Sequence, residues 1–434
     1  MTKTNIDINQ EFKQAFRLIE KEGKNLFITG HAGTGKSTLL TYIKDNALKK
    51  SVVLAPTGVA AVNISGQTIH SFFKFRPNIT LQKARSLGLR YRKNKIYQEL
   101  ELLIIDEISM VRADLLDAVN IFLQANRGNN YPFGGVQIAF FGDLHQLPPV
   151  LRNDEKDNFN LRYASPYFFS SDVFQQIINL NFTILSLKKI YRQTDETFIG
   201  LLSKIRRNEA NKDDLYAINQ RYFDSDIHSV DGEQPIYLTT INAKANKINS
   251  YNLSNLPGNS HTYYAKIGGD FNINQAPTSD ELDLKVGARV MFLNNEKGGT
   301  WINGTLGMIT KIKEEAVDVL IDGEFTPVEV EAFSWEMYKA EFNDEKQQII
   351  SKSIGSFKQI PLKLAWAVTI HKAQGKTFDK VIIDLDRGTF AHGQLYVALS
   401  RCTSLKGIYL RQEIEKRHIL TDRTILEFEE KINK

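Results

Sequence analysis

The sequence predicts an α/β fold with two parallel-sheet cores, in about residues 1–180 and 181–434. Two observations carry this prediction. Short, nearly continuous apolar runs recur along the chain, and segments with helical spacing lie between or after them. Strands that are apolar on both faces are typical of parallel sheets covered by helices. Each block is therefore expected to contain one such sheet.

The elements follow in chain order. The apolar runs expected to form strands are Leu26–Ile28, Val52–Ala55, Leu102–Ile105, Ile138–Phe141, Ile184–Leu187, Ile236–Leu238, Ala365–Val368, Val381–Ile383 and Ile408–Leu410. Helical spacing of apolar residues covers residues 39–47, 112–125 and 196–207. Strands that alternate with helices in this way favour a parallel sheet in each block.

Two stretches depart from the pattern. Residues 76–98 carry a basic run among tyrosines, with no acid before Glu99, and are expected to form a small arm of the first block. Residues 286–355 alternate apolar and polar positions between glycine turns, as in VGARVMFL and GTLGMITKI. Such alternation is typical of short antiparallel strands. We therefore expect a small β-barrel inserted into the second block.

Composition excludes some classes of protein. No apolar run of the 434 residues approaches the roughly 20 residues that span a bilayer. The first residues are polar and lack the apolar core of a secretion signal, so no signal is expected. Cys402 is the only cysteine, so an internal disulfide is excluded and a packing role in a reducing cytoplasm is expected. The formal net charge of +5 permits a nucleic-acid partner without demanding one.

The strongest motif is GHAGTGKS, from Gly30 to Ser37, which follows a predicted strand and precedes a predicted helix. This context is that of a P-loop, in which backbone N–H groups and the start of the helix face phosphate oxygens. The lysine would reach the β and γ phosphates, and the serine hydroxyl would bind Mg²⁺. The residues expected to bind the nucleotide here are Gly33, Thr34, Gly35, Lys36, Ser37 and Thr38.

An acid pair follows the apolar run of LLIIDEIS. Asp106, at the end of the predicted strand, is placed to hold Mg²⁺ through water. Glu107 is placed to orient or deprotonate the attacking water. An isolated acid pair is usually a solvated strand end, but together with a P-loop it predicts a nucleotide hydrolase.

With these motifs in view, the chain resembles superfamily 1 helicases of the 5′→3′ class, and within them the Pif-one family. The resemblance covers nearly the whole chain and rests on motifs in a fixed order. They are the P-loop, VVLAPTGVAA, GQTIHSFF, DEISMV, LLDAVNIFLQANRGNNYPFGGVQI, FFGDLHQLPPV, KKIYRQ, AWAVTIHKAQGKTFDKVIID and YVALSRC. It implies two RecA-like cores, with the arm acting as a wedge and the insert as an SH3-like barrel.

The resemblance also implies roles around the nucleotide. Gln146 would sense the γ-phosphate, Arg192 would contact phosphate, Gly375 would line the site, and Arg401 would be the arginine finger. Arginines far from the P-loop in sequence make sense if the second core completes the site across a cleft. A guanidinium there stabilises charge that develops on the γ-phosphate.

The adenine-reading motif departs from the family pattern. The family places a glutamine near the N-terminus, where this chain has Phe12. Gln10 is the expected substitute, with Gln14 as the alternative, so the selectivity for adenine stays open.

The strand-binding residues are expected near the basic arm and in TIHKAQGKT, and they are Thr57, His70, Phe72, Pro77, His371 and Lys372. Aromatic faces stack on bases while cations bind phosphates. The alternatives are that the phenylalanines of residues 72–75 belong to the core, that His371 is a core histidine, and that the basic run is a solvated helix face.

The resemblance implies a monomeric ATP- and Mg²⁺-dependent helicase that binds single-stranded DNA and its junctions with duplex. G-quadruplexes and RNA–DNA hybrids are further implied partners, with roles in DNA repair, recombination and telomere maintenance. Two alternatives stay open at this point. One is an ATPase switch that moves on nucleic acid without separating strands, and the other is a P-loop kinase acting on a small molecule.

Overall fold

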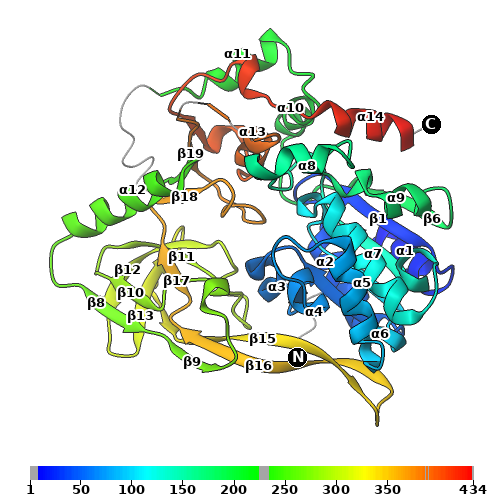
Figure 1. Ribbon diagram of the computed structural model, residues 1–434. Coiled ribbons are helices and arrows are strands. Elements are labelled where there is room, and N and C mark those ends of the chain that lie inside the picture. Colours follow the sequence, from blue (N-terminus) through cyan, green and yellow to red (C-terminus); the bar gives the residue numbers. More distant parts are fainter. Residues whose placement is uncertain (1–7, 224–233, 387, 390, 433–434) are drawn as a thin grey trace.

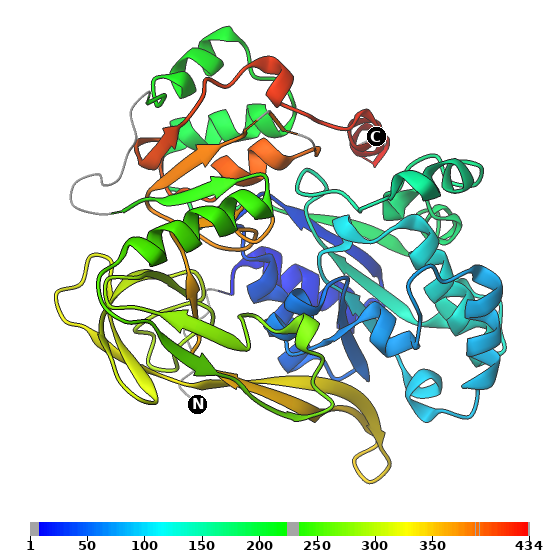
Figure 2. The same ribbon diagram turned by 60° about the vertical axis from the view of Figure 1, so that its left-hand side comes forward.

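The computed structural model describes residues 8–223, 234–386, 388–389 and 391–432. Figures 1 and 2 show two α/β cores stacked beside a region built mainly of β-strands. No helix among the described residues is both long and apolar enough to cross a membrane. Cys402 is buried, as expected for a packing residue.

The first core contains a parallel sheet. Its strand order is β3 (Gln67–Thr68), β2 (Ser51–Ala55), β4 (Leu102–Ile105), β5 (Gln137–Phe141), β1 (Asn25–Gly30) and β6 (Phe182–Leu187). Each neighbouring pair is parallel. The predicted apolar runs therefore form the strands of this sheet except the two-residue β3, which was not predicted. Because β6 pairs with β1, the first sheet extends beyond the boundary expected at residue 180.

Helices cover both faces of this sheet. Leu26 and Ile28 of β1 pack on one face, whereas Phe27 packs on the other. The helices of this core are α1 (Gln10–Glu20), α2 (Lys36–Asn46), α3 (Gly58–Asn63), α4 (Ile69–Phe73), α7 (Ala113–Arg127), α8 (Lys156–Asn160) and α9 (Asp172–Ile177). Burial of β1 on both faces explains why its sequence is continuously apolar.

The basic arm is helical and lies on α7. It contains α5 (Leu81–Arg90) and α6 (Lys95–Glu99). At Gly88 an added Cβ would lie 2.4 Å from the carbonyl oxygen of Phe122, so a glycine is needed for this close packing. Arg90, Arg92 and Lys93 are exposed.

The second core contains a smaller parallel sheet. Its strand order is β18 (Ala367–Thr369), β7 (Ile236–Thr239), β19 (Val381–Asp384) and β20 (Ile408–Leu410). The accompanying helices are α10 (Glu196–Arg206), α11 (Lys212–Asn219), α12 (Asn242–Asn255) and α13 (Gln394–Leu399). All four strands were expected from apolar runs, although β18 begins later than predicted.

The insert is antiparallel, as expected, but wider than residues 286–355. One sheet has the order β14 (Val328–Glu331), β13 (Ala316–Ile321), β12 (Leu306–Ile312), β11 (Arg289–Phe292) and β17 (Leu362–Leu364). A second pairs β10 (Glu281–Leu284) with β8 (His261–Tyr264), and a third joins β15 (Phe333–Asn343), β16 (Gln348–Gln359) and β9 (Lys266–Gly269). The first two sheets share a core. Closure into an SH3-like barrel stays a prediction.

The long β15–β16 hairpin leaves the insert and reaches the first core (Figure 1). The backbone N–H of Ala340 donates to Oε1 of Gln67 over 2.8 Å. Phe342 packs against the core of the first block, and Asp344 pairs with Lys95 of the arm. The hairpin therefore joins the insert to the arm side of the first core.

The last helix that the structure describes also packs on the first core. The helix α14 (Arg423–Ile432) follows β20 in sequence, but its Ile425 and Phe428 join the first core's apolar cluster. The short 3-10 turns are η1 (Ile108–Met110), η2 (Pro132–Gly135), η3 (Asn153–Glu155), η4 (Phe168–Ser170), η5 (Ile273–Gln275), η6 (Leu405–Gly407) and η7 (Lys416–His418).

Candidate active site between the two cores

The P-loop joins β1 to α2 and touches the second block. Gly33 and Gly35 adopt positive φ angles of 81° and 84°, which glycine adopts without strain. A Cβ added at Gly33 would lie 2.5 Å from Cβ of Arg192. The loop therefore needs glycine both for its curl and for the close approach of this arginine.

Lys36 begins α2 and turns back into the loop. Its Nζ donates to the carbonyl oxygens of Gly30 (2.8 Å) and His31 (3.0 Å). Burial lowers the pKa of Lys36, while the carboxylates of Asp143 and Glu107 oppose that shift. An ammonium held at the start of a helix fits the phosphates of a nucleotide.

The other predicted P-loop residues with hydroxyl groups differ in their exposure to solvent. Thr34 is buried, and its Oγ1 donates to the carbonyl oxygen of His31 over 3.0 Å. Ser37 and Thr38 are exposed in the first turn of α2. Their hydroxyls are thus open to a ligand, whereas Thr34 holds the loop's shape.

The acid pair follows β4, as predicted. Burial raises the pKa of Asp106 to about 6. Burial, together with the nearby Asp106 carboxyl, raises the pKa of Glu107 to about 7. Glu107 also has a positive φ of 48°, an uncommon conformation for a side chain other than glycine. A carboxyl that has a raised pKa and stands on a strained backbone is typical of a functional site, and it suits a general base.

Gln146 lies beside the acid pair and is buried. Its Nε2 donates to Oδ2 of Asp143 over 3.2 Å. Its Oε1 accepts from Nε2 of Gln374 over 3.0 Å, and the same Nε2 lies 3.3 Å from Oε2 of Glu107. Gln374 comes from the second core, so it links the predicted sensor and base across the boundary between cores.

Sequence reasoning missed Gln374, although it lies between His371 and Gly375 in a motif that was identified. It also missed Tyr396, whose hydroxyl accepts from the backbone N–H of Ala32 in the P-loop over 3.1 Å. The signal for both was their position in late motifs that supply the other half of the site.

Arg192 lies where the two cores meet. Its Nη1 donates to the carbonyl oxygen of Ser400 (3.2 Å) and its Nη2 to that of Gly375 (3.3 Å). Burial lowers its pKa to about 10. Its position against Gly33 brings together three predicted elements: the P-loop, Gly375 and the last motif.

Arg401 is almost fully buried, at 1% exposure. Its Nε donates to the carbonyl oxygen of Val397 and its Nη2 to Oγ of Ser400, both over 2.9 Å. Burial lowers the pKa of Arg401 to about 9, and repulsion from Arg192 adds to the effect. Among the described residues neither guanidinium is paired with a carboxylate, and the two repel each other, an arrangement suited to a polyanionic ligand.

The adenine side differs from the family pattern in a way that the structure explains. Phe12 is 2% exposed, and its ring would be 3.3 Å from a Cβ at Gly35. The ring of Phe12 therefore packs against the P-loop at Gly35. Gln10 is exposed at the first position of α1, and no hydrogen bond to another described residue fixes its amide.

This arrangement predicts weak base selectivity. Because no buried amide reads the base from the family's position, we expect kcat/KM for GTP to lie within about tenfold of that for ATP. A site built around a hydrogen bond would discriminate by about 10⁴-fold or more. Steady-state hydrolysis of both nucleotides checks this result. Strong discrimination that disappears in Gln10→Ala would instead show that Gln10 reads adenine.

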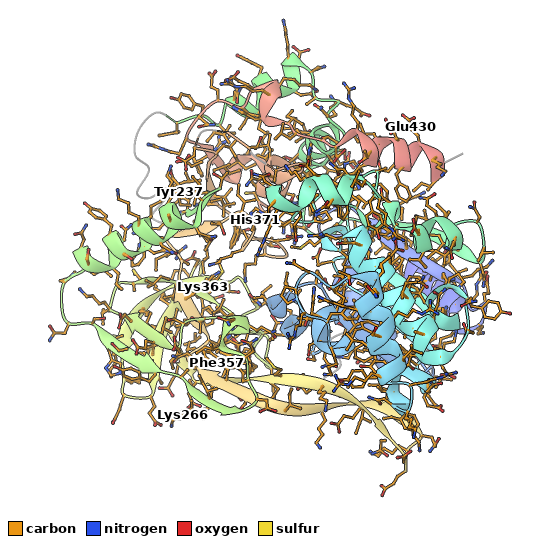
Figure 3. All side chains as sticks on the ribbon, in the orientation of Figure 1. Tyr237, Lys266, Phe357, Lys363, His371 and Glu430 are labelled. Atoms are coloured by element: carbon orange, nitrogen blue, oxygen red, sulfur yellow. The ribbon has the colours of Figure 1, made fainter. Side chains whose placement is uncertain are left out.

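The predicted strand-binding residues lie mostly on the surface. Thr57, Pro77, His371 and Lys372 are exposed, and His70 is half-buried. Thr57 also caps α3, since its side chain accepts from the N–H of Ala60 over 3.3 Å. Figure 3 shows His371 near the centre of the molecule, where the second core faces the insert. Its exposure disagrees with the alternative of a core histidine.

The prediction for Phe72 needs correction. Its side chain is 3% exposed and packs edge-to-face against Phe73 and Tyr97, with ring centroids 4.8 and 5.3 Å apart. Phe73 and Phe75 are buried in the same cluster. No face of these rings is free for a base, so the core interpretation applies to all three.

Comparisons with known proteins agree with this site. The model of PIF1-like helicases matches residues 7–215, and that of the UvrD-like helicase C-terminal domain matches residues 364–405. The chain is 34% identical to the ATP-dependent DNA helicase Pif1 of Psychrobacter sp., over 92% of this chain and 67% of that protein. It is 34% identical to the ATP-dependent DNA helicase PIF1 of Danio rerio, over 95% of this chain. It spans only 62% of that longer relative.

Solved structures give the same picture. Bacteroides sp. Pif1 in complex with ADP-AlF4 is 36% identical, with a TM-score of 0.88 over 98% of this chain and 97% of that one. Bacteroides Pif1 bound to ssDNA is 37% identical, with a TM-score of 0.66 over 98% and 96%. The nearly full-length match, together with the P-loop, acid pair and remote arginines, shows that the chain belongs to the PIF1-like helicase family, whose curated members are ATP-dependent DNA helicases.

Proposed function

We propose that this chain is an ATP-dependent DNA helicase that moves 5′→3′ along a single strand and separates the strand paired with it. The observation that carries the proposal is the composite site. Lys36 of the P-loop and Glu107 come from the first core, whereas Arg192 and Arg401 come from the second block. Arg192 approaches Gly33 of the P-loop, and the positive charge of Arg401 opposes the rise in the pKa of Glu107. A site shared between cores couples hydrolysis to their relative movement.

The residues present fit ATP and Mg²⁺. The glycine curl and the exposed first turn of α2 suit phosphate oxygens. The Ser37 hydroxyl and the Asp106 carboxylate are the oxygen donors that would hold Mg²⁺. When bound, the ion would neutralise phosphate charge. We assign base activity to Glu107, γ-phosphate sensing to Gln146, and charge stabilisation to Arg192 and Arg401.

The single strand of DNA would run across exposed residues of both cores. His371 and Lys372 are assigned to its phosphates, with Thr57, His70 and Pro77 on the first core. The exposed basic face of α5 and the turn after it would contact the backbone near a junction. This assignment rests on charge and exposure, since phosphates bind surface cations. We further propose that the protein acts as a monomer in the cytoplasm. G-quadruplexes and RNA–DNA hybrids are proposed as additional substrates.

The test is unwinding of forked DNA with a single tail. We expect duplex with a 5′ tail to be unwound in the presence of ATP and Mg²⁺, and duplex with only a 3′ tail to stay paired. Single-stranded DNA should raise ATP turnover by at least about tenfold, since strand binding completes the site. Quenched-fluorophore duplexes and a coupled phosphate assay measure the two quantities.

The outcomes separate the alternatives. Unwinding from 3′ tails alone would contradict the polarity. Strand-stimulated hydrolysis without unwinding of any substrate would favour an ATPase switch. Absence of stimulation by DNA and RNA would favour a small-molecule kinase. The same assay on quadruplex and hybrid substrates tests the finer partner assignments.

A further inference from the structure

The C-terminal helix α14 has an apolar side fixed to the first core. Phe428 stacks on Phe169 with ring centroids 4.4 Å apart and an interplanar angle of 4°. It also meets Phe174 edge-on at 5.7 Å. The preceding strand, β20, lies in the other core's sheet. Because the helix is held by aromatic packing, the side chain next to Phe428 is placed with little freedom.

That next side chain is Glu429, and it points into a buried polar cluster. Its Oε1 lies 2.8 Å from Nε2 of His145 and 3.8 Å from Nη2 of Arg206. His145 is 3% exposed, and its Nδ1 has no hydrogen-bond partner among the described residues. Glu429 therefore supplies the imidazole ring's hydrogen bond, with Nε2–H donating to the carboxylate.

A chain of hydrogen bonds connects this cluster to the hydrolysis centre. Nη2 of Arg206 donates to Oδ1 of Asp143 over 3.0 Å. Oδ2 of Asp143 accepts from Gln146, and Gln146 in turn accepts from Gln374, which reaches Glu107. The path thus runs from α14 through α10 and the loop after β5 to the predicted base.

Charge in this path is balanced by pairing. Burial would raise the pKa of Asp143, but Arg206 and Lys36 outweigh it and hold that pKa well below its usual range. Burial likewise opposes ionisation of Glu429, and the hydrogen bond from His145 lowers its pKa nonetheless. Arg206 is 8% exposed between the two carboxylates. Removing one carboxylate leaves the buried positive charge of Arg206 less fully neutralised, which lowers the free energy of unfolding.

The loop that this cluster supports carries the predicted sensor. Residues 142–150 contain no helix or strand. The backbone N–H of Gln146 donates to the carbonyl oxygen of Asp143 over 3.0 Å, and side-chain contacts such as that of His145 with Glu429 add to this support. We propose that Glu429 is a positioning residue for ATP hydrolysis, acting through His145 and Arg206 on the loop that carries Gln146. The proposal rests on the ATPase activity proposed above. Positioning groups on rigid elements hold reacting groups within the narrow tolerance that catalysis needs.

The test compares two adjacent carboxylates on α14. We expect Glu429→Ala to lower kcat for strand-stimulated ATP hydrolysis about tenfold, the low end of the effect of losing an outer hydrogen-bond partner at a metal site. KM for ATP and affinity for a fluorescent ADP should stay within about twofold. Glu429→Gln keeps an acceptor for His145 and should recover part of the lost turnover. The control is Glu430→Ala, because Glu430 is exposed on the same helix (Figure 3). This variant should hydrolyse ATP at the parent rate.

A double variant and a melting curve distinguish positioning from mere stability. If Glu429 acts through His145, Glu429→Ala combined with His145→Ala should be no slower than the slower single variant. Multiplication of the two effects would contradict that path. A lower Tm for Glu429→Ala with unchanged kcat would show a purely structural role and overturn the proposal. Failure of the proposed function is separate, because it would appear in the parent as hydrolysis insensitive to DNA.

Discussion

Glu107→Gln is expected to bind ATP with near-parent affinity and to hydrolyse it about 10²–10⁴-fold more slowly, the range typical of a lost general base. The substitution keeps the side chain's volume and an acceptor for Gln374, which lies 3.3 Å away. It removes only the carboxylate that we propose takes a proton from water. Single-turnover hydrolysis, beside fluorescent-nucleotide binding, measures both quantities.

The matched control lies at the other end of the same strand. Glu101 precedes β4 and is exposed, and its carboxylate accepts from the backbone N–H of Lys50 over 2.8 Å. Glu101→Gln should therefore hydrolyse ATP at the parent rate. Parent-like turnover in Glu107→Gln would reject the assignment of the base, whatever the control does.

Arg401→Ala is expected to lower strand-stimulated kcat by about 10³-fold or more, because a guanidinium that stabilises transition-state charge has an effect of that size. Binding of ATP and single-stranded DNA should change far less, since the interaction strengthens in the transition state. Arg401→Lys keeps the charge but loses the planar fork that reaches Val397 and Ser400, so we expect only partial recovery. Rapid-quench ATPase assays measure the loss.

Burial makes a stability control necessary for this variant. Arg401→Ala leaves a cavity and unpaired carbonyl groups, so its melting temperature must be measured beside its kcat. Arg417, which is exposed in the same core and pairs with Glu415, provides the matched position. Arg417→Ala should match the parent in both quantities. Near-parent turnover in folded Arg401→Ala and Arg401→Lys would remove the case for an arginine finger.

Sequence alone predicted the strands of both parallel sheets except the two-residue β3, because a strand that is buried on two faces has a continuous apolar run. It predicted the phosphate-binding loop for a similar reason. Gly33 and Gly35 are needed locally, by the backbone conformation of the loop itself. Features set by local geometry or by burial of one segment leave a readable pattern.

Features that depend on contacts between distant segments leave no such pattern in the sequence. Phe72 and its neighbours have the composition of a stacking platform, and only the packing of Tyr97 and Phe122 around them shows that they are core. The hydrogen bonds of Gln374 depend on how the two cores sit together, and nothing in its own neighbourhood encodes that. The same holds for the β15–β16 hairpin, whose alternation predicted strands but not their contact with the first core.

The return of α14 to the first core bears on how the chain acquires its structure during synthesis. Phe169 and Phe174 emerge from the ribosome long before Phe428, the ring that covers them. Both rings also pack on aromatic neighbours within the first core, such as Tyr167 and Phe168, but the faces that Phe428 covers stay exposed until α14 has been made. Chains with transiently exposed apolar surface are prone to aggregate. The first core is thus completed only after α14 has been synthesised, so translation products that stop before it would keep that apolar surface and become substrates for chaperones and proteases.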